Sequence, residues 1–207
     1  TLGLHVDGGT ARAVGDAAAT ATAKLDMPSL LALAAALGWA SGFRLYAVVF
    51  LVGMMGVLGW MPLPPGLVML QHPLVLMVSG FMLMVEFFAD KVPWVDSAWD
   101  AIHAFIRVPA GAALAYGVFG ADNATMAVVA GLLGGSLSAT ALATKMTTRA
   151  AVNTSPEPFS NWGLSFFEDG LVVAVVWLAT QHPVAFGIAL VVMVAVSVLL
   201  LVVLFKF

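Results

Sequence analysis

Six long apolar stretches, separated by short polar segments, dominate the pattern of this chain. About 20 apolar residues in a helix cross the ~30 Å hydrocarbon layer of a bilayer, and most of the stretches are close to that length. The pattern therefore predicts an all-α membrane protein, with a bundle of six transmembrane helices over residues 27–207. The predicted spans are Pro28–Gly59, Pro73–Phe88, Ala101–Phe119, Ala124–Thr144, Trp162–Thr180 and Pro183–Phe205.

Two of these stretches depart from the length that a bilayer requires. Pro73–Phe88 is short unless neighbouring residues extend the helix, whereas Pro28–Gly59 is too long. Gly38, Gly42 and Arg44 stand in the middle of the long stretch. We expect either one tilted helix here or a helix that is broken near these residues.

Residues 1–26 differ in character from the rest of the chain. They are rich in Ala, Thr and Gly and show no sustained apolar face, which predicts a flexible tail, either native or foreign to the protein. A basic start followed by a short apolar core is missing, so we expect no signal peptide. The chain therefore divides into this polar tail and the transmembrane domain.

The Lys and Arg residues outside the apolar stretches test this topology, because cytoplasmic loops of membrane proteins carry an excess of positive charge. If the N-terminus is inside, all of these residues fall on the inner side of the membrane. We therefore expect both termini in the cytoplasm. The residues concerned are Arg12, Lys24, Lys91, Lys145, Arg149 and Lys206.

Composition excludes several classes of protein. Hydrophobic residues make up 62% of the chain and charged residues 9%, with a mean hydropathy of +1.04, whereas soluble domains are about 25% charged. A soluble globule, a disordered chain and a nucleic-acid-binding protein are excluded, and the expected partner is the lipid bilayer. The chain has a net charge of −3 and no cysteine, which excludes disulfides and thiolate metal sites.

Enzyme motifs are missing as well. The sequence contains no His-Glu-x-x-His, Gly-x-Ser-x-Gly, phosphate-binding or dinucleotide-binding motif. Asp96 and Asp100 form an Asp-x-x-x-Asp pair but lack the further aspartates that a metal-diphosphate site requires. An enzyme is therefore the least supported class, and nothing in the sequence indicates a particular cofactor.

Four polar residues mark the start of the third predicted helix. Asp96, Asp100, His103 and Arg107 are spaced by four, three and four residues, which places them on one helix face. Asp96, Asp100 and His103 can act together as ligands of a metal cation or as a proton relay, with Arg107 tempering the charge. Alternatively, the two carboxylates only stabilise the positive end of the helix dipole.

Charged residues also occur within the other apolar stretches. Glu168 and Asp169 lie well inside the fifth stretch, where exposure to lipid costs about 2.5–3.5 kcal/mol per charge. Arg44 needs an acidic partner for the same reason, and Glu86, Glu168 and Asp169 are the candidates. These groups are interpreted either as ion pairs that fix helix register or as part of a polar pathway through the bundle.

A second group of polar residues lies after the fourth stretch, in a predicted inner loop. Lys145, Arg149, Asn153 and Asn161 can hold a phosphate or a lipid headgroup. The alternative is a helix start, in which Ser160 or Asn161 caps the fifth helix.

Small residues at spacings of four predict close helix contacts in the first and fourth stretches. We expect these faces to be available for pairing between copies of the chain, and therefore a homo-oligomer. The faces are Ala34, Gly38 and Gly42 in the first stretch and Gly131, Gly135 and Ala139 in the fourth.

Three segments, at residues 37–44, 86–96 and 153–162, resemble the domain of unknown function 4126 family. They read Leu-Gly-Trp-Ala-Ser-Gly-Phe-Arg, Glu-Phe-Phe-Ala-Asp-Lys-Val-Pro-Trp-Val-Asp and Asn-Thr-Ser-Pro-Glu-Pro-Phe-Ser-Asn-Trp, and the resemblance extends from Met27 to the C-terminus. It implies a small multi-helix bacterial membrane protein whose role is not assigned, so no catalytic residue is carried over.

The residues favour a small transporter or channel-like protein for ions, protons or metal cations. The alternative is a non-transporting accessory or assembly subunit of a larger membrane complex, in which the buried charges are structural. A third hypothesis is the handling of lipid or polyprenyl phosphate at Arg107, Lys145 and Arg149.

Overall fold

The computed structural model describes residues 26–120, 123–154 and 158–206, and within these ranges the chain forms helices and connecting turns only. Of the predicted tail, only Asp26 lies among the described residues. Its side chain caps the first helix by accepting a hydrogen bond from the amide of Ser29 at 3.1 Å. The helices are α2 (Met27–Val57), η1 (Pro65–Gln71), α3 (Pro73–Ala89), α4 (Pro93–Phe119), α5 (Ala124–Val152), α6 (Pro158–Gln181) and α7 (Pro183–Leu204).

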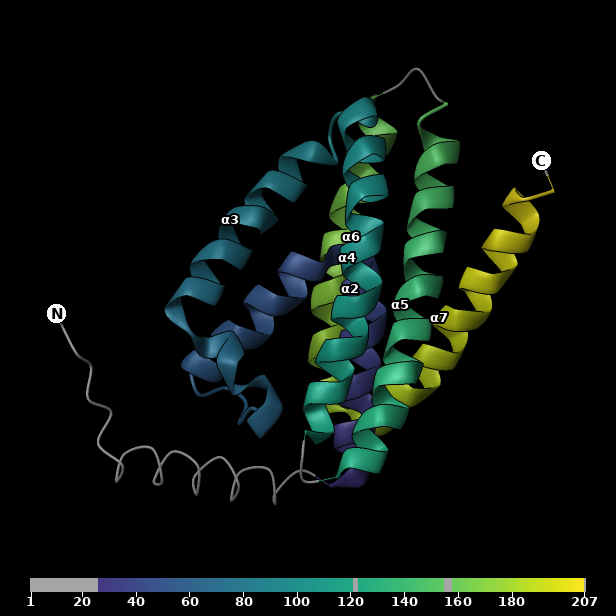
Figure 1. Ribbon diagram of the computed structural model, residues 1–207. Helices are drawn as coiled ribbons and strands as arrows, with labels where there is room; N and C mark the ends of the chain where they lie inside the picture. Colours follow the sequence, from purple (N-terminus) through teal and green to yellow (C-terminus); the bar gives the residue numbers. More distant parts are fainter. Residues whose placement is uncertain (1–25, 121–122, 155–157, 207) are drawn as a thin grey trace, which may run out of the picture.

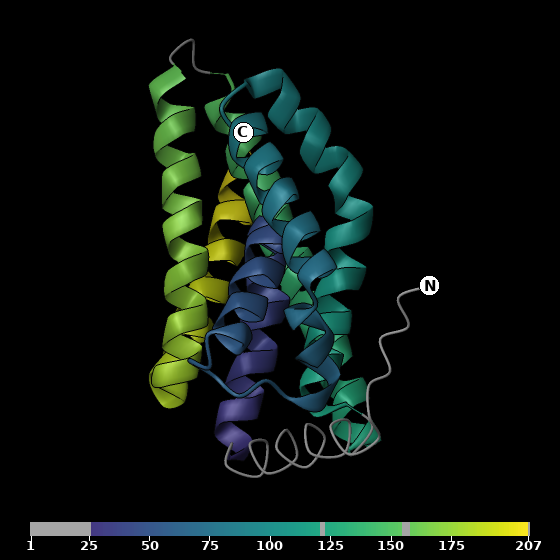
Figure 2. The ribbon, with the colours of Figure 1, turned by 90° about the vertical axis from the view of Figure 1, so that its left-hand side faces the viewer.

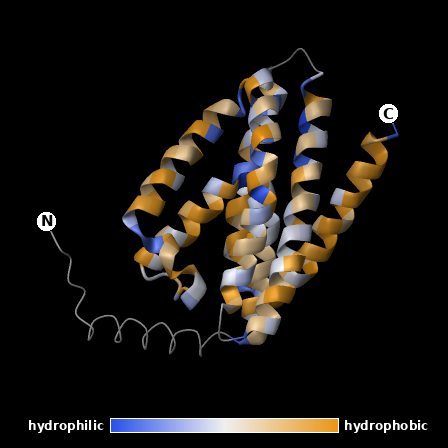
Figure 3. Ribbon diagram, viewed as in Figure 1, coloured by the Kyte–Doolittle hydropathy of each residue, from blue (hydrophilic) through white to orange (hydrophobic). Residues whose placement is uncertain are grey.

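The helices agree with a membrane protein. Five of them are long and apolar enough to cross a bilayer, and a sixth span results if η1 and α3, which meet at an angle of 70°, are counted together. Most of α3 and α7 is hydrophobic, whereas hydrophilic stretches occur in the central helices and on α5 (Figure 3). The hydropathy pattern thus predicts where the helices lie, whereas the described helices give five or six candidate spans.

Helix α2 is broken in its middle, as one of the two interpretations of the long first stretch predicts. Arg44 has φ −143° and ψ 75°, outside the helical range. Figures 1 and 2 show that the first half rises through the bundle and that the second half returns toward the end from which the first half started. Ser29 and Leu33 accordingly line the same small cavity as Trp60 and Met61. Both ends of α2 therefore lie at one end of the bundle.

This path changes the predicted topology. Pro28 and Leu31 share a cavity with Pro183 and Phe186, so the start of α2 lies beside the start of α7. The end of α7 lies at the opposite end of the bundle (Figure 1). The prediction that both termini of the helical domain lie on one side therefore differs from the structure, because it counts the first stretch as a single crossing.

The fold-back of α2 can be tested by cysteine labelling, since the chain has no cysteine of its own. Cysteines introduced by Asp26→Cys and Trp60→Cys flank α2 and are expected on one side of the membrane. A cysteine introduced by Trp94→Cys is expected on the other side, because α4 begins at the opposite end. Labelling with an impermeant maleimide, in intact cells and in inverted vesicles, measures the side. Labelling of positions 26 and 60 from opposite sides would contradict the fold-back.

Small residues bring α2 and α4 into close contact with α5. A Cβ atom added to Gly38 would lie 2.5 Å from the Cα of Gly134, and one added to Gly111 would meet the side chains of Ser41 and Ser138. The glycines of α2 thus form the predicted close helix contact, but they do so within one chain. The reason given for a homo-oligomer, that these faces are free, does not hold for α2.

Candidate functional site

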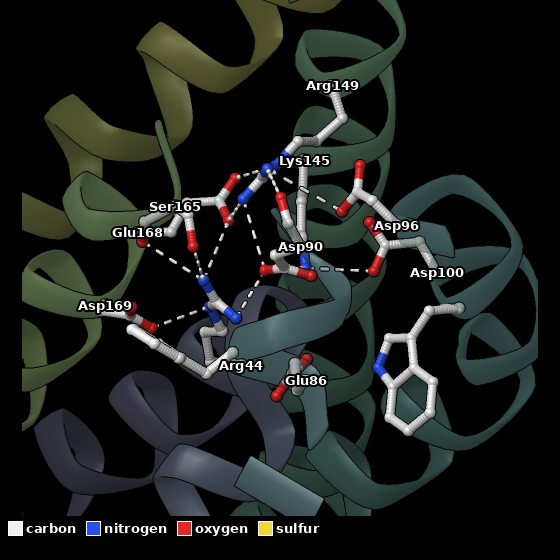
Figure 4. A network of polar contacts seen from close by, with 12 residues as sticks. Arg44, Glu86, Asp90, Asp96, Asp100, Lys145, Arg149, Ser165, Glu168 and Asp169 are labelled. Atoms are coloured by element: carbon white, nitrogen blue, oxygen red, sulfur yellow. Dashed lines mark hydrogen bonds and ion pairs between the residues drawn. The ribbon is translucent and has the colours of Figure 1, made fainter. Parts of the chain in front are cut away.

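Ten charged side chains gather between the helices and form what we call the charge network. Nine of them are at most 2% exposed, whereas the side chain of Asp169 is 27% exposed. The basic members are Arg44, Arg107, Lys145 and Arg149, and the acidic members are Glu86, Asp90, Asp96, Asp100, Glu168 and Asp169. They come from α2 to α6 and from the α3–α4 turn (Figure 4).

Arg44 joins the network at the break of α2. Its guanidinium group lies 2.5 Å from a carboxylate oxygen of Asp90, 3.0 Å from Asp169 and 3.8 Å from Glu168. It also donates hydrogen bonds to the hydroxyl and the carbonyl oxygen of Ser165, at 2.9 and 3.2 Å. Two of the three predicted acidic partners of Arg44 are therefore confirmed.

Arg149 links α5 to α6 and to the α3–α4 turn. It donates two hydrogen bonds to the two carboxylate oxygens of Glu168, at 2.6 and 3.2 Å, a fork geometry typical of strong arginine–carboxylate pairs. It also donates to the Asp90 side chain at 3.3 Å and to the Asp90 carbonyl at 3.0 Å. Of the two adjacent carboxylates, Asp169 thus contacts Arg44, whereas Glu168 lies nearest to Arg149 and also contacts Arg44 at 3.8 Å.

Arg107 and Lys145 complete the network on the side of α3 and α4. Arg107 lies 2.5 Å from Glu86, the third predicted partner of Arg44, and 2.7 Å from Asp100. The Lys145 ammonium lies 3.0 Å from Asp100 and 3.5 Å from Asp90. The carboxylates of α4 therefore face basic side chains in the interior, which is more than the helix-dipole interpretation requires.

Asp90 is the central residue that the sequence reasoning missed as a candidate. It lies in the turn after α3 and contacts Arg44, Lys145 and Arg149. Burial alone would raise its pKa, but the positive charges of these three side chains hold the pKa of Asp90 below its ordinary value. Its spacing of four residues from Glu86 was the available signal, because such residues share a helix face.

The predicted metal ligands are only partly brought together. Carboxylate oxygens of Asp96 and Asp100 lie within 4.8 Å of each other, and the third group within that distance belongs to Asp90. His103 is turned elsewhere: its Nδ1 lies 2.8 Å from the carbonyl oxygen of Trp99, and its ring stacks on the Trp99 ring at 4.0 Å.

The residues predicted to hold a phosphate or a lipid headgroup instead contact other groups of the protein. Lys145 and Arg149 are buried in the charge network, because α5 continues to Val152 instead of ending at the predicted Thr144. Asn161 is also buried, and its carbonyl oxygen accepts a hydrogen bond of 3.5 Å from Arg149. The amide group of Asn153 donates to the hydroxyl of Ser97 at 3.2 Å.

One cavity reaches the network from the lipid-facing side. It has a volume of about 230 Å³ and lies between α2, α5, α6 and α7. Trp39, Phe43 and Phe167 form part of its apolar wall, and Lys145 and Glu168 also line it. A small, mostly apolar space therefore lies against Lys145 and Glu168 of the network.

Comparison with known proteins gives one match. The family model described as "Domain of unknown function (DUF4126)" matches residues 31–203, which is most of the chain and includes every member of the charge network. No curated protein and no solved structure matches the chain.

Proposed function

Because the chain belongs to the DUF4126 family, whose description assigns no activity, we propose a function from the charge network itself. The protein is a small multi-pass transporter or channel-like protein of the bacterial inner membrane that moves protons or small cations. The network is the polar part of its pathway.

The observation that carries this proposal is the position of the network at the break of α2. Charges within a membrane are costly and mark ion or proton pathways in many membrane proteins. Non-helical backbone at membrane depth is tolerated where protein buries it or where it lines a cavity, and transporters place their binding sites at broken helices. In this chain Arg44 is both the point of the break and a member of the network.

The distribution of basic residues supports an orientation for the pathway. Lys91 and Arg149 lie at the end of the bundle that carries the α3–α4 turn, and Lys206 follows α7 at the same end. Because positive charge favours the cytoplasmic side, that end faces the cytoplasm. The network then lies in the cytoplasmic half, and the start of α2 faces the opposite side.

The alternative is an accessory subunit whose charges only fix helix register. It predicts a different ratio of acidic to basic groups. A register lock is best served by closed pairs, since an unpaired buried charge is strongly destabilising. The network instead has six carboxylates for four basic groups. One oxygen of Glu86, fully buried, has no hydrogen-bond partner among the described residues. This surplus of negative charge favours a site that binds and releases protons or cations.

Flux measurements in liposomes test the proposal. Wild-type protein is expected to dissipate a pH or cation gradient faster than protein-free liposomes. Asp169→Asn and Glu86→Gln are expected to slow the flux about tenfold or more, since each removes a negative charge that stabilises a passing cation by roughly 4 kcal/mol at contact distance. A pH-sensitive dye inside the vesicles reports proton flux, and an ion-sensitive dye reports cations.

The matched control is Asp26→Asn, which changes an exposed carboxylate outside the network and keeps a capping side chain at the start of α2. Its flux should equal that of the wild type. Wild-type flux no faster than that of empty liposomes, together with co-purification of foreign subunits in a fixed ratio, would instead support the accessory role.

A further inference from the structure

The fully buried part of the charge network carries a surplus of negative charge. Five carboxylates at most 2% exposed face four basic groups that are equally buried, and the partly exposed Asp169 adds a further carboxylate. An arginine or lysine for every buried carboxylate would balance the charge, and one is missing. Because an uncompensated buried charge is costly, one more positive charge, a proton or a cation, would stabilise the network.

Three of these carboxylates, those of Asp90, Asp96 and Asp100, meet at one point of the network. The carboxylate oxygens of this triad lie within 4.8 Å of one another. Asp96 has the weakest contact with a cation, 3.9 Å from Arg149, whereas Asp90 and Asp100 each have an ion pair of 2.7 Å or less. One oxygen of each aspartate is buried without a hydrogen-bond partner in the part of the chain that the structure describes.

The Lys145 ammonium already lies beside two members of the triad. This ammonium is fully buried and lies against Asp100 at 3.0 Å and Asp90 at 3.5 Å, yet it makes no hydrogen bond with any described residue. An ammonium is a compact charge on a flexible stem, whereas the arginine forks are held by several fixed contacts. Lys145 is thus a cation tethered beside the triad that can move.

Space for this movement exists beside the triad. Lys145 also lines the cavity of about 230 Å³ between α2, α5, α6 and α7. Thr148 and Ser197 line the same cavity, and their hydroxyl oxygens can accept hydrogen bonds from the ammonium. The side chain can therefore leave the carboxylates without entering lipid.

We propose that Asp90, Asp96 and Asp100 bind a monovalent alkali cation, Na⁺ or K⁺, and that the Lys145 ammonium competes with it for the triad. Carboxylate oxygens are the ligands that hard cations prefer. One bound monovalent cation would balance the one excess negative charge of the fully buried groups. This count includes Lys145, which stays charged when its ammonium lies in the cavity. This inference rests on the proposed function, for which it names the cargo or coupling ion.

Thermal unfolding of the full chain in lipid nanodiscs tests the site. The midpoint is expected to rise with NaCl or KCl, compared with choline chloride at equal ionic strength, because a ligand of the folded state stabilises it. Asp96→Asn should abolish the rise. Lys145→Ala removes the competing charge and is expected to tighten cation binding about tenfold or more, because like charges at contact distance repel each other.

Lys206→Ala, a lysine after α7 outside the network, is the matched control and should respond as the wild type does. Equal midpoints in all three salts for the wild type and Lys145→Ala would overturn the proposal, as would a midpoint that follows pH but neither Na⁺ nor K⁺. If Lys145→Ala does not fold, the comparison of the wild type with Asp96→Asn still tests the cation site. Midpoints that depend on the cation, without flux in liposomes, would support the cation site and refute transport. Flux without a cation-dependent midpoint would support transport and refute the cation site.

Discussion

Replacement of Arg44 by alanine is expected to lower the free energy of unfolding by about 3–5 kcal/mol, the range for removal of one partner from a buried ion pair. The loss is large because Arg44 is fully buried and holds Asp90 and Asp169 at 2.5 and 3.0 Å. Without it, the charge surplus of the network grows by one, and both halves of α2 lose their link to α6.

Arg44→Lys should recover only part of this stability. An ammonium keeps the charge, but it cannot reproduce the arrangement in which separate guanidinium nitrogens reach Asp90, Asp169 and Ser165. Titration with SDS in mixed micelles, followed by circular dichroism, measures the change in each variant.

Lys91→Ala is a suitable control for the loss of a positive charge. Lys91 lies at the edge of the network, with its ammonium 3.1 Å from the centre of the Phe87 ring. Its removal should cost only about 0.5–1 kcal/mol, the usual value of an exposed cation–π contact. Equal stability losses in Arg44→Ala and Lys91→Ala would contradict the central role of Arg44.

Hydropathy predicted the helices but made several of them too short. Helix α4 begins at Pro93 instead of Ala101, and α5 ends at Val152 instead of Thr144. In each case the apolar stretch stops at the first charged residues, whereas the helix continues through them. These residues face one another inside the protein, so they interrupt the hydropathy pattern without interrupting the helix.

The buried charges other than Asp90 could be predicted, but their pairing could be predicted only in part. Arg44 needs acidic partners in any apolar setting, which correctly indicated Glu168 and Asp169. The assignment of Glu86 to Arg107 depends on how α3 leans against α4, and no pattern in the sequence fixes that. His103 shares a helix face with Asp100, yet it turns to Trp99, since spacing alone does not choose a rotamer.

The path of α2 was the hardest feature to predict from the sequence. A stretch of apolar residues has the same hydropathy pattern whether the helix crosses the bilayer once or turns back in the middle. Gly38, Gly42 and Arg44 indicated a break, but its direction follows from contacts with distant residues. The returning half packs on η1: Leu70 closely approaches Gly53, and Gln71 closely approaches Gly56.

A bulky side chain at Gly38 is expected to prevent the packing of the first half of α2 on α5. A Cβ atom there would lie 2.5 Å from Cα and 2.8 Å from the carbonyl oxygen of Gly134, and backbone atoms cannot move aside as the end of a side chain can. Gly38→Leu must therefore push α2 away from α5. We expect a loss well above the usual range of about 1–3 kcal/mol for overpacking, and little folded protein.

Gly170→Leu is the matched control, because a Cβ atom at Gly170 meets no described atom within 4 Å. The same change of residue on the exposed face of α6 should leave folding intact or improve it, since leucine favours helix more than glycine by up to about 1 kcal/mol. Size-exclusion chromatography of both variants in mild detergent measures the folded fraction. If Gly38→Leu elutes with the yield and retention of Gly170→Leu, then α2 does not lie against α5. In that case the position of Arg44 within the charge network is wrong as well, since the same half-helix carries both residues.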